Sequence, residues 1–186
     1  GAEVFVNQAL VGKTPFEDSN LSVQEYTINL VSNEASWAGK IKLSGSTLTV
    51  INRELSKETT TSSGEVLSLD KGRGATIIST PSGADIEIDG RLYGKTPTAV
   101  SIGEGEHVFV LSKDNYLKRS IKALVPAGYS LQLNVDLALA EPDLTTITTP
   151  PIKETKVVLV KNTPTGFLRI RDKPSLTGNE ITRVSP

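Results

Sequence analysis

The feature that most constrains this chain is an internal repeat. The first fifteen residues, Gly1 to Pro15, read Gly-Ala-Glu-Val-Phe-Val-Asn-Gln-Ala-Leu-Val-Gly-Lys-Thr-Pro and return as residues 83–97 with seven positions identical. The spacing of 82 residues is too long for a solenoid and is typical of tandem independent domains. The similarity continues more loosely, because residues 26–30 have the pattern of residues 107–111. The repeat therefore predicts two copies of one small domain, called repeat one and repeat two below.

Within the repeat, the residue pattern is that of β-hairpins. Residues 86–93 alternate apolar and polar side chains, and Asp89-Gly90 is a two-residue turn that tolerates positive φ at both positions. Repeat one has Asn7-Gln8 at this place, and Gln lacks the freedom of glycine, so we expect a looser hairpin there. No segment carries a helical apolar stripe with caps. We predict an all-β fold of tandem small β-sandwich domains.

The pattern divides the chain into five segments. They are repeat one at 1–53, a polar linker with one short strand at 54–71, repeat two at 72–140, a Thr/Pro-rich linker at 141–156 and a third unit at 157–186. Repeat two has a strand-like segment, Ala75 to Thr80, ahead of Gly83, whereas repeat one begins at the equivalent of Gly83. We therefore expect repeat one to lack its first strand and to carry an unpaired sheet edge, which recruits other strands.

Three motifs of repeat two together resemble the PEGA domain: Pro81-Ser-Gly-Ala84, the hairpin at 86–93 and Gly94-Lys-Thr-Pro97. Ser82 stands where that family has Glu, and the resemblance spans most of residues 1–139. It implies tandem PEGA domains of a surface-layer-like protein, outside the cell or in the envelope of a bacterium or archaeon. It also implies no enzymatic activity and no cofactor.

The third unit resembles the start of a bacterial SH3-like domain. Residues 165–171 read Thr-Gly-Phe-Leu-Arg-Ile-Arg, where that family usually has Thr-Gly-Trp-Leu-Asn-Val-Arg, so Phe167 replaces Trp and Arg169 replaces Asn. Pro174-Ser175 follows, as does the strand-like end of the chain at 181–186. The resemblance implies a partial SH3-like β-barrel, a family whose members often bind cell-wall peptides or glycans.

Composition excludes several classes of function. Lys and Arg together number 20 against 21 for Asp and Glu, which argues against nucleic acid as a partner. The chain has no Cys, so disulfides, Cys-based metal sites and thiol nucleophiles are excluded. No apolar run approaches the ~18 residues of a membrane span, so no direct membrane span is expected.

Residues that could support catalysis or metal binding have simpler interpretations. Gly-Lys-Thr occurs at 12–14 and at 94–96, but a phosphate loop needs an earlier Gly and a following helix, and Pro follows each Thr. Asp85, Glu87 and Asp89 imitate the start of a calcium loop without its closing Glu. His107 is the only imidazole, and repeat one has Tyr26 in its place. We predict no catalytic residue, no metal site and no cofactor.

Trp37 and Tyr116 are the candidate ligand-contacting residues. Trp37 is the only Trp and is placed in a loop after residues 33–36, and Tyr116 is placed in the equivalent turn of repeat two. Exposed aromatic rings stack on sugars, although amphipathic rings also cap the open end of a sandwich. The PEGA resemblance implies a non-catalytic structural or adhesive module that contacts neighbouring copies of itself or other envelope proteins. The alternatives are a cell-wall or surface glycan-binding module using these two rings, and a regulatory domain attached to an enzyme.

Overall fold

The computed structural model describes residues 1–141, 168–171 and 179–184. The chain divides into two compact units, Gly1–Pro142 and Asp143–Pro186. The described residues form β-strands and one short 3-10 helix, with no α-helix among them, which confirms the all-β prediction.

The first unit holds thirteen strands and the 3-10 helix. Those of repeat one are β1 (Glu3–Val6), β2 (Ala9–Lys13), β3 (Glu25–Ser32), β4 (Ala35–Lys42) and β5 (Val50–Glu54). Between the repeats lie η1 (Thr59–Thr61) and β6 (Ser63–Lys71). Those of repeat two are β7 (Ala75–Thr80), β8 (Asp85–Ile88), β9 (Arg91–Lys95), β10 (Thr98–Val100), β11 (Gly105–Ser112), β12 (Arg119–Val125) and β13 (Tyr129–Asp136).

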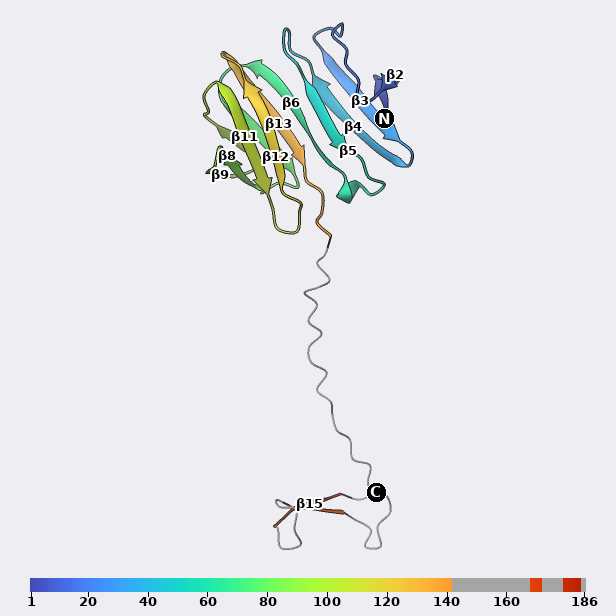
Figure 1. Ribbon diagram of the computed structural model, residues 1–186, viewed down its shortest axis with the longest axis vertical. Helices are drawn as coiled ribbons and strands as arrows, with labels where there is room; N and C mark the ends of the chain where they lie inside the picture. Colours follow the sequence, from blue (N-terminus) through green and yellow to red (C-terminus); the bar gives the residue numbers. More distant parts are fainter. Residues whose placement is uncertain (142–167, 172–178, 185–186) are drawn as a thin grey trace. The chain divides into compact units, whose positions relative to one another are not determined.

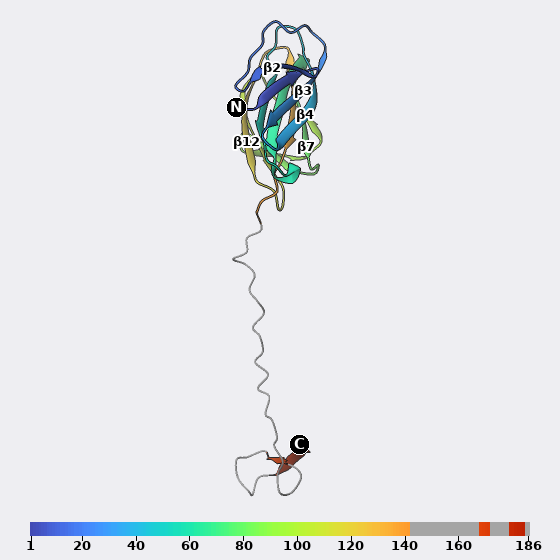
Figure 2. The same ribbon diagram turned by 90° about the vertical axis from the view of Figure 1, so that its right-hand side faces the viewer.

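These strands form three sheets that stand as layers in Figure 1. The central sheet has the order β10-β7-β13-β6-β5. The sheet of repeat two, β12-β11-β8-β9, lies on one side of it, and the sheet of repeat one, β2-β1-β3-β4, lies on the other. Figure 2, turned by 90°, looks onto the sheet of repeat one, with β2, β3 and β4 in front of the other layers.

Each outer sheet encloses its own hydrophobic core against the central sheet. The core of repeat two holds Ile77, Ile86 and Phe109, none of them measurably exposed, and the core of repeat one holds residues such as Val4 and Ile28. Strand β6 contributes to both, because alternate side chains of a strand point to opposite faces. Leu67 packs against the core of repeat two, and Val66 packs against the core of repeat one.

The segment at 54–71 differs from the predicted linker with one short strand. It contains β6, a nine-residue strand that pairs with β13 along residues 64–71 and with β5 along residues 63–67. The two strands that flank β6 come from different repeats, so its pairing partners cannot be recognised from the local sequence. The polar residues 56–62 form the turn and the 3-10 helix that lead into it.

The hairpin turn of repeat one is not looser than that of repeat two, contrary to our expectation. Asn7 and Gln8 have φ of 47° and 72°, close to the 50° and 80° of Asp89 and Gly90. The first turn residue determines this geometry. The Asn7 backbone N–H donates to the Thr27 carbonyl at 2.8 Å, and its Oδ1 accepts from the Thr27 N–H at 2.9 Å. The Asp89 backbone and carboxylate make the same pair of bonds with Val108, at 3.0 and 2.8 Å.

The described part of the second unit is a pair of antiparallel strands, β14 (Leu168–Arg171) and β15 (Glu180–Val184). The predicted linker at 141–156 lies outside the described residues except for Glu141, as does most of the predicted third unit at 157–186.

Candidate interaction sites

The two candidate aromatic residues line one cavity of about 310 Å³. Trp37 lies within strand β4 rather than in a loop, because the β3–β4 turn is tighter than predicted and ends before it. Tyr116 lies in the β11–β12 turn, as predicted, and bridges to Leu139. Hydroxyl groups share the wall with the two rings; these are Ser36, Thr59, Thr60, Ser62 and Thr80. The cavity therefore offers two aromatic surfaces and several hydrogen-bonding groups.

A buried arginine forms part of the same wall. The Arg53 side chain is 4% exposed, its guanidinium lies 4.8 Å from the centre of the Trp37 ring, and its Nη1 is 2.7 Å from Oδ2 of Asp136. Arg53 Nε is buried and has no hydrogen-bond partner among the described residues. A cation over an aromatic face is favourable, so this contact fixes the plane of the indole at the cavity.

Gly64 makes the Arg53–Asp136 contact possible. It pairs with Arg53 on β5 and with Asp136 on β13, so it lies directly between them in the sheet. A Cβ at Gly64 would lie 2.3 Å from the Asn52 carbonyl oxygen and 2.8 Å from Arg53 Cδ. Both distances are too short for a contact between non-bonded atoms, so a residue with a Cβ would not fit at position 64 without a shift of the backbone. The predicted sites do not include Arg53, Gly64 or Asp136, because no local sequence pattern marks them.

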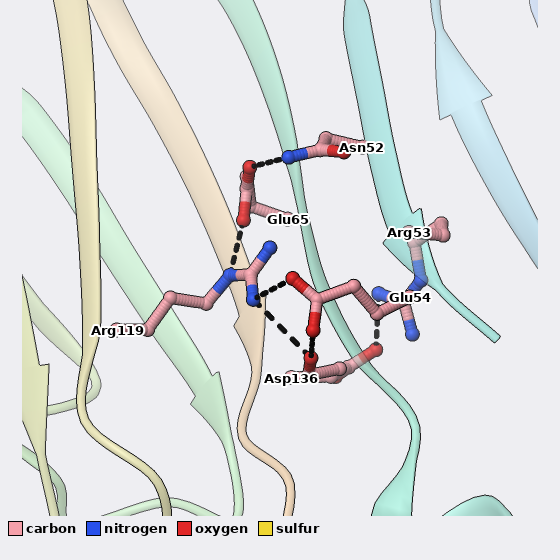
Figure 3. A network of polar contacts seen from close by, with 7 residues as sticks. Asn52, Arg53, Glu54, Glu65, Arg119 and Asp136 are labelled. Carbon is pink, nitrogen blue, oxygen red and sulfur yellow. Dashed lines mark hydrogen bonds and ion pairs between the residues drawn. The ribbon is translucent and has the colours of Figure 1, made fainter. Parts of the chain in front are cut away.

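A second arginine connects the sheet of repeat two to the central sheet (Figure 3). Arg119 on β12 donates through Nε to Glu65 of β6 and through Nη1 to Glu54 of β5, the latter at 3.1 Å. Asn52 donates to the other Glu65 oxygen at 2.7 Å, so the buried Glu65 carboxylate is paired and hydrogen-bonded. The hydrogen bond from Arg119 also holds the pKa of Glu54 below its usual range. This arrangement fits a structural network, because its charges are already compensated.

His107 is held by two oxygen acceptors. Its Nδ1 is 2.6 Å from Asp89 Oδ2, and its Nε2 is 3.1 Å from the Gly103 carbonyl oxygen. The hydrogen bond with Asp89 raises the pKa of His107 above its ordinary value, and the backbone N–H of Val108 is the main cause that lowers the pKa of Asp89. Both ring nitrogens are donors only in the protonated imidazole, so this geometry favours the cation.

The remaining motifs lie at strand ends. Lys13 ends β2 and Lys95 ends β9, and Lys95 Nζ is 2.7 Å from Asp85 Oδ1. Thr96 Oγ1 accepts a hydrogen bond from the Ala84 backbone N–H at 3.0 Å. Over the part of the chain that the structure describes, no group of three potential metal ligands occurs. The Gly-Lys-Thr residues thus have local structural partners rather than a helix beside them.

The central sheet has one edge at β5. In repeat two, β13 pairs on one side with β6 and on the other, in parallel, with β7. In repeat one, β5 pairs with β6, and its other side has no partner strand in the described ranges. Among the described strands β5 is therefore an edge strand, and the absence of a first strand from repeat one stays a prediction.

Comparison with protein families gave one match. The model of the PEGA domain family matches residues 74–141, which are β7 to β13 together with the following residues. The match agrees with the resemblance of repeat two, whereas the assignments of repeat one and of residues 157–186 stay predictions. Comparisons with curated proteins and with solved structures found no match. PEGA domains are typical of extracellular or periplasmic proteins.

None of the described residues forms a helix that is long and apolar enough to cross a membrane.

Proposed function

We propose that the chain is a non-catalytic structural or adhesive module of a prokaryotic cell-envelope or surface protein, and that it acts through protein–protein contacts. The observation that carries this proposal is the match of the PEGA family model to residues 74–141, because PEGA domains are typical of extracellular or periplasmic proteins. The described outer sheets end in strands such as β4 and β12, and the edges of sheets can pair with other polypeptides. Neighbouring copies of the chain and other envelope proteins are the partners of this kind. The PEGA match at residues 74–141 supports the location.

Within this proposal, repeat one is a second PEGA domain, and residues 157–186 belong to an SH3-like domain. Equivalent hydrogen bonds support the first assignment. Thr14 Oγ1 accepts from the Ala2 backbone N–H at 2.8 Å, as Thr96 Oγ1 accepts from Ala84 at 3.0 Å. The second assignment rests on the sequence pattern at residues 165–171.

Binding to isolated envelopes of the source cell tests the proposed function. Envelopes are pretreated with protease, with glycan-degrading enzymes or with neither, and co-sedimentation of the purified chain is measured. Protein contacts predict that protease removes the binding and that glycan degradation leaves it unchanged. Binding that survives protease would contradict the proposal.

A second candidate function is binding of a surface or cell-wall glycan in the cavity at Trp37 and Tyr116. The observation in its favour is that two rings from distant parts of the sequence line one cavity together with several hydroxyl groups. Apolar sugar faces stack on such rings, while their hydroxyls bond to polar groups. On a glycan array, binding should disappear in both Trp37→Ala and Tyr116→Ala and persist in Tyr116→Phe. Circular dichroism controls for folding, because Trp37 also packs against the core of repeat one.

A further inference from the structure

We propose that the cavity at Trp37 and Tyr116 is specific for uncharged saccharides, and that Arg53 and Asp136 together set this specificity. The inference rests on the glycan-binding candidate of the proposed function, since it names the class of sugar that this cavity takes. All residues that line the cavity belong to the first compact unit, so its walls are defined within that unit.

The aromatic walls of the cavity are held in place by the protein itself. The Trp37 ring contacts the Arg53 guanidinium at 4.8 Å, and a Cβ at Gly39 would lie 2.5 Å from two carbons of the indole, Cζ2 and Cη2. The indole thus occupies space that glycine on the same strand leaves open. The backbone of Tyr116 is held by a β-bridge to Leu139. A site that is rigid in advance loses little conformational entropy on binding, which favours affinity.

The cavity carries two opposite charges that compensate each other. Among its described lining residues, only Arg53 and Asp136 are charged, and Arg53 Nη1 is 2.7 Å from Asp136 Oδ2. Glu54 and Glu65 also lie near Arg53 in Figure 3, but Arg119 binds both of them on the opposite face of the central sheet. The site therefore has no net charge to attract an ion.

The same two side chains leave hydrogen-bonding capacity for a ligand. Arg53 Nε is buried and has no hydrogen-bond partner among the described residues, and a buried donor without an acceptor is unfavourable. The Asp136 side chain is 36% exposed, and a carboxylate has acceptor sites beyond its contact with one arginine. A hydroxyl group is both donor and acceptor, so two neighbouring hydroxyls of a sugar ring can accept from the guanidinium and donate to the carboxylate. An uncharged saccharide thus matches both groups at once.

An acidic sugar lacks this match. A carboxylate group on the ligand is an acceptor only, so it cannot donate to Asp136, and like charges at close range repel each other. An acid that bound to Arg53 in place of Asp136 would also leave the Asp136 carboxylate without its partner, which is unfavourable. The cavity therefore discriminates against sugars that carry a carboxylate.

Matched pairs of disaccharides test the specificity on the full wild-type chain. Cellobiose, mannobiose and galactobiose are each compared with the counterpart whose C6 groups are carboxylates. Trp37 is the only Trp, so its fluorescence reports on the cavity. We expect a saturable change with at least one neutral disaccharide at millimolar concentration, and no change in Tyr116→Ala. The affinity for the acidic counterpart should be at least about tenfold lower, a difference of about 1.4 kcal/mol.

A variant of Asp136 tests the source of the specificity. Asp136→Asn keeps the shape of the side chain and removes its charge, so the Arg53 charge is no longer compensated. The preference for the neutral over the acidic disaccharide should fall at least about tenfold in this variant. The control is Asp85→Asn, which also removes an ion pair, that with Lys95 Nζ at 2.7 Å, and should leave the preference unchanged. A purely structural role of Asp136 would lower both affinities together.

Three results would overturn the proposal: no response to any neutral disaccharide, equal or tighter binding of the acidic counterparts, and the same preference in Asp136→Asn and wild type. If Asp136→Asn does not fold by circular dichroism, the comparison of the wild-type affinities decides by itself. Tighter binding of acidic sugars would reject the specificity and leave the glycan-binding candidate standing. None of these results affects the envelope-binding experiment, because protease sensitivity reports protein contacts.

Discussion

At the scale of single residues, the two hairpin turns have one backbone conformation and different side chains. Gln8 has φ of 72°, whereas Gly90 has φ of 80° at the equivalent position. A left-handed conformation costs a residue with a Cβ about 1 kcal/mol relative to glycine. We expect Gln8→Gly to raise the free energy of unfolding by up to about 1 kcal/mol in urea denaturation.

The reciprocal variant is the control for this prediction. A Cβ at Gly90 would meet no atom within 4 Å, so Gly90→Gln changes backbone preference without a steric clash. It should lower stability by a similar amount. Destabilisation by Gly90→Gln without stabilisation by Gln8→Gly would mean that contacts of the Gln8 side chain offset its backbone cost.

The His107–Asp89 pair predicts a pH dependence of stability. The pKa of His107 is raised in the folded protein, so its contribution is fully present below pH 6.5, the unfolded value, and is lost as pH rises through the folded pKa. The pKa of Asp89 is lowered, so its contribution is present above pH 3.8 and is lost as pH falls through the folded pKa. The pair therefore contributes most between these two values. Urea unfolding as a function of pH, together with NMR titration of His107, measures this contribution.

Asp89→Asn is the matched variant, because Asn7 already occupies this position in repeat one and accepts the equivalent backbone bond. It should keep the turn, return the pKa of His107 toward its ordinary value and remove the extra stability that the pair gives between pH 3.8 and 6.5. A His107 titration that is the same in wild type and Asp89→Asn would contradict the assignment of the carboxylate as the main cause.

At the scale of elements, β6 is the strand on which the two repeats depend together. It gives β13 its second neighbour and β5 its only neighbour among the described strands. We expect a fragment of residues 72–140 to fold alone. It keeps the whole outer sheet of repeat two and strands β10, β7 and β13 of the central sheet, and it lacks β6. A fragment of residues 63–140 should have a higher urea midpoint, because β6 pairs with β13 and adds Leu67 and Leu69 to that core.

Circular dichroism of both fragments measures these midpoints. Equal midpoints would show that β6 belongs energetically to repeat one alone. An unfolded fragment 72–140 beside a folded fragment 63–140 would move the boundary of the second domain to the start of β6.

At the scale of the first compact unit, the shared sheet predicts that the two cores unfold together. Val66 and Leu67 are adjacent on β6 and pack into different cores, so loss of one core exposes part of the strand that supports the other. Trp37, the only Trp, packs against the core of repeat one and reports on it by fluorescence. Ile86→Val in the core of repeat two should therefore lower the Trp37 denaturation midpoint, at a cost of about 1 kcal/mol.

The control for this prediction is Leu92→Val. Leu92 is 71% exposed on β9, so the same shortening of a side chain should leave the midpoint unchanged. If Ile86→Val leaves the Trp37 midpoint unchanged while circular dichroism shows a second, earlier transition, the two cores unfold independently.

The sequence by itself determined what depends on near neighbours. Alternation at residues 86–93 and the turn at Asp89-Gly90 specify a hairpin, because strand period and turn conformation are local properties. The repeat of residues 1–15 at 83–97 predicted a second hairpin of the same kind, and β1 and β2 form it. The role of the second turn residue was misjudged, because Asn7 fixes the turn through Thr27, a contact across the sheet.

Only the tertiary structure decided which distant residues meet. Trp37 and Tyr116 were selected separately, and the packing of the three sheets places both at one cavity. The contact of Arg53 with Asp136 exists because β6 lies between their strands and places Gly64 opposite both residues. The short strand predicted within residues 54–71 became β6, a strand shared by both repeats, for the same reason. Strand pairing between remote segments depends on the packing of the whole chain, which no local pattern encodes.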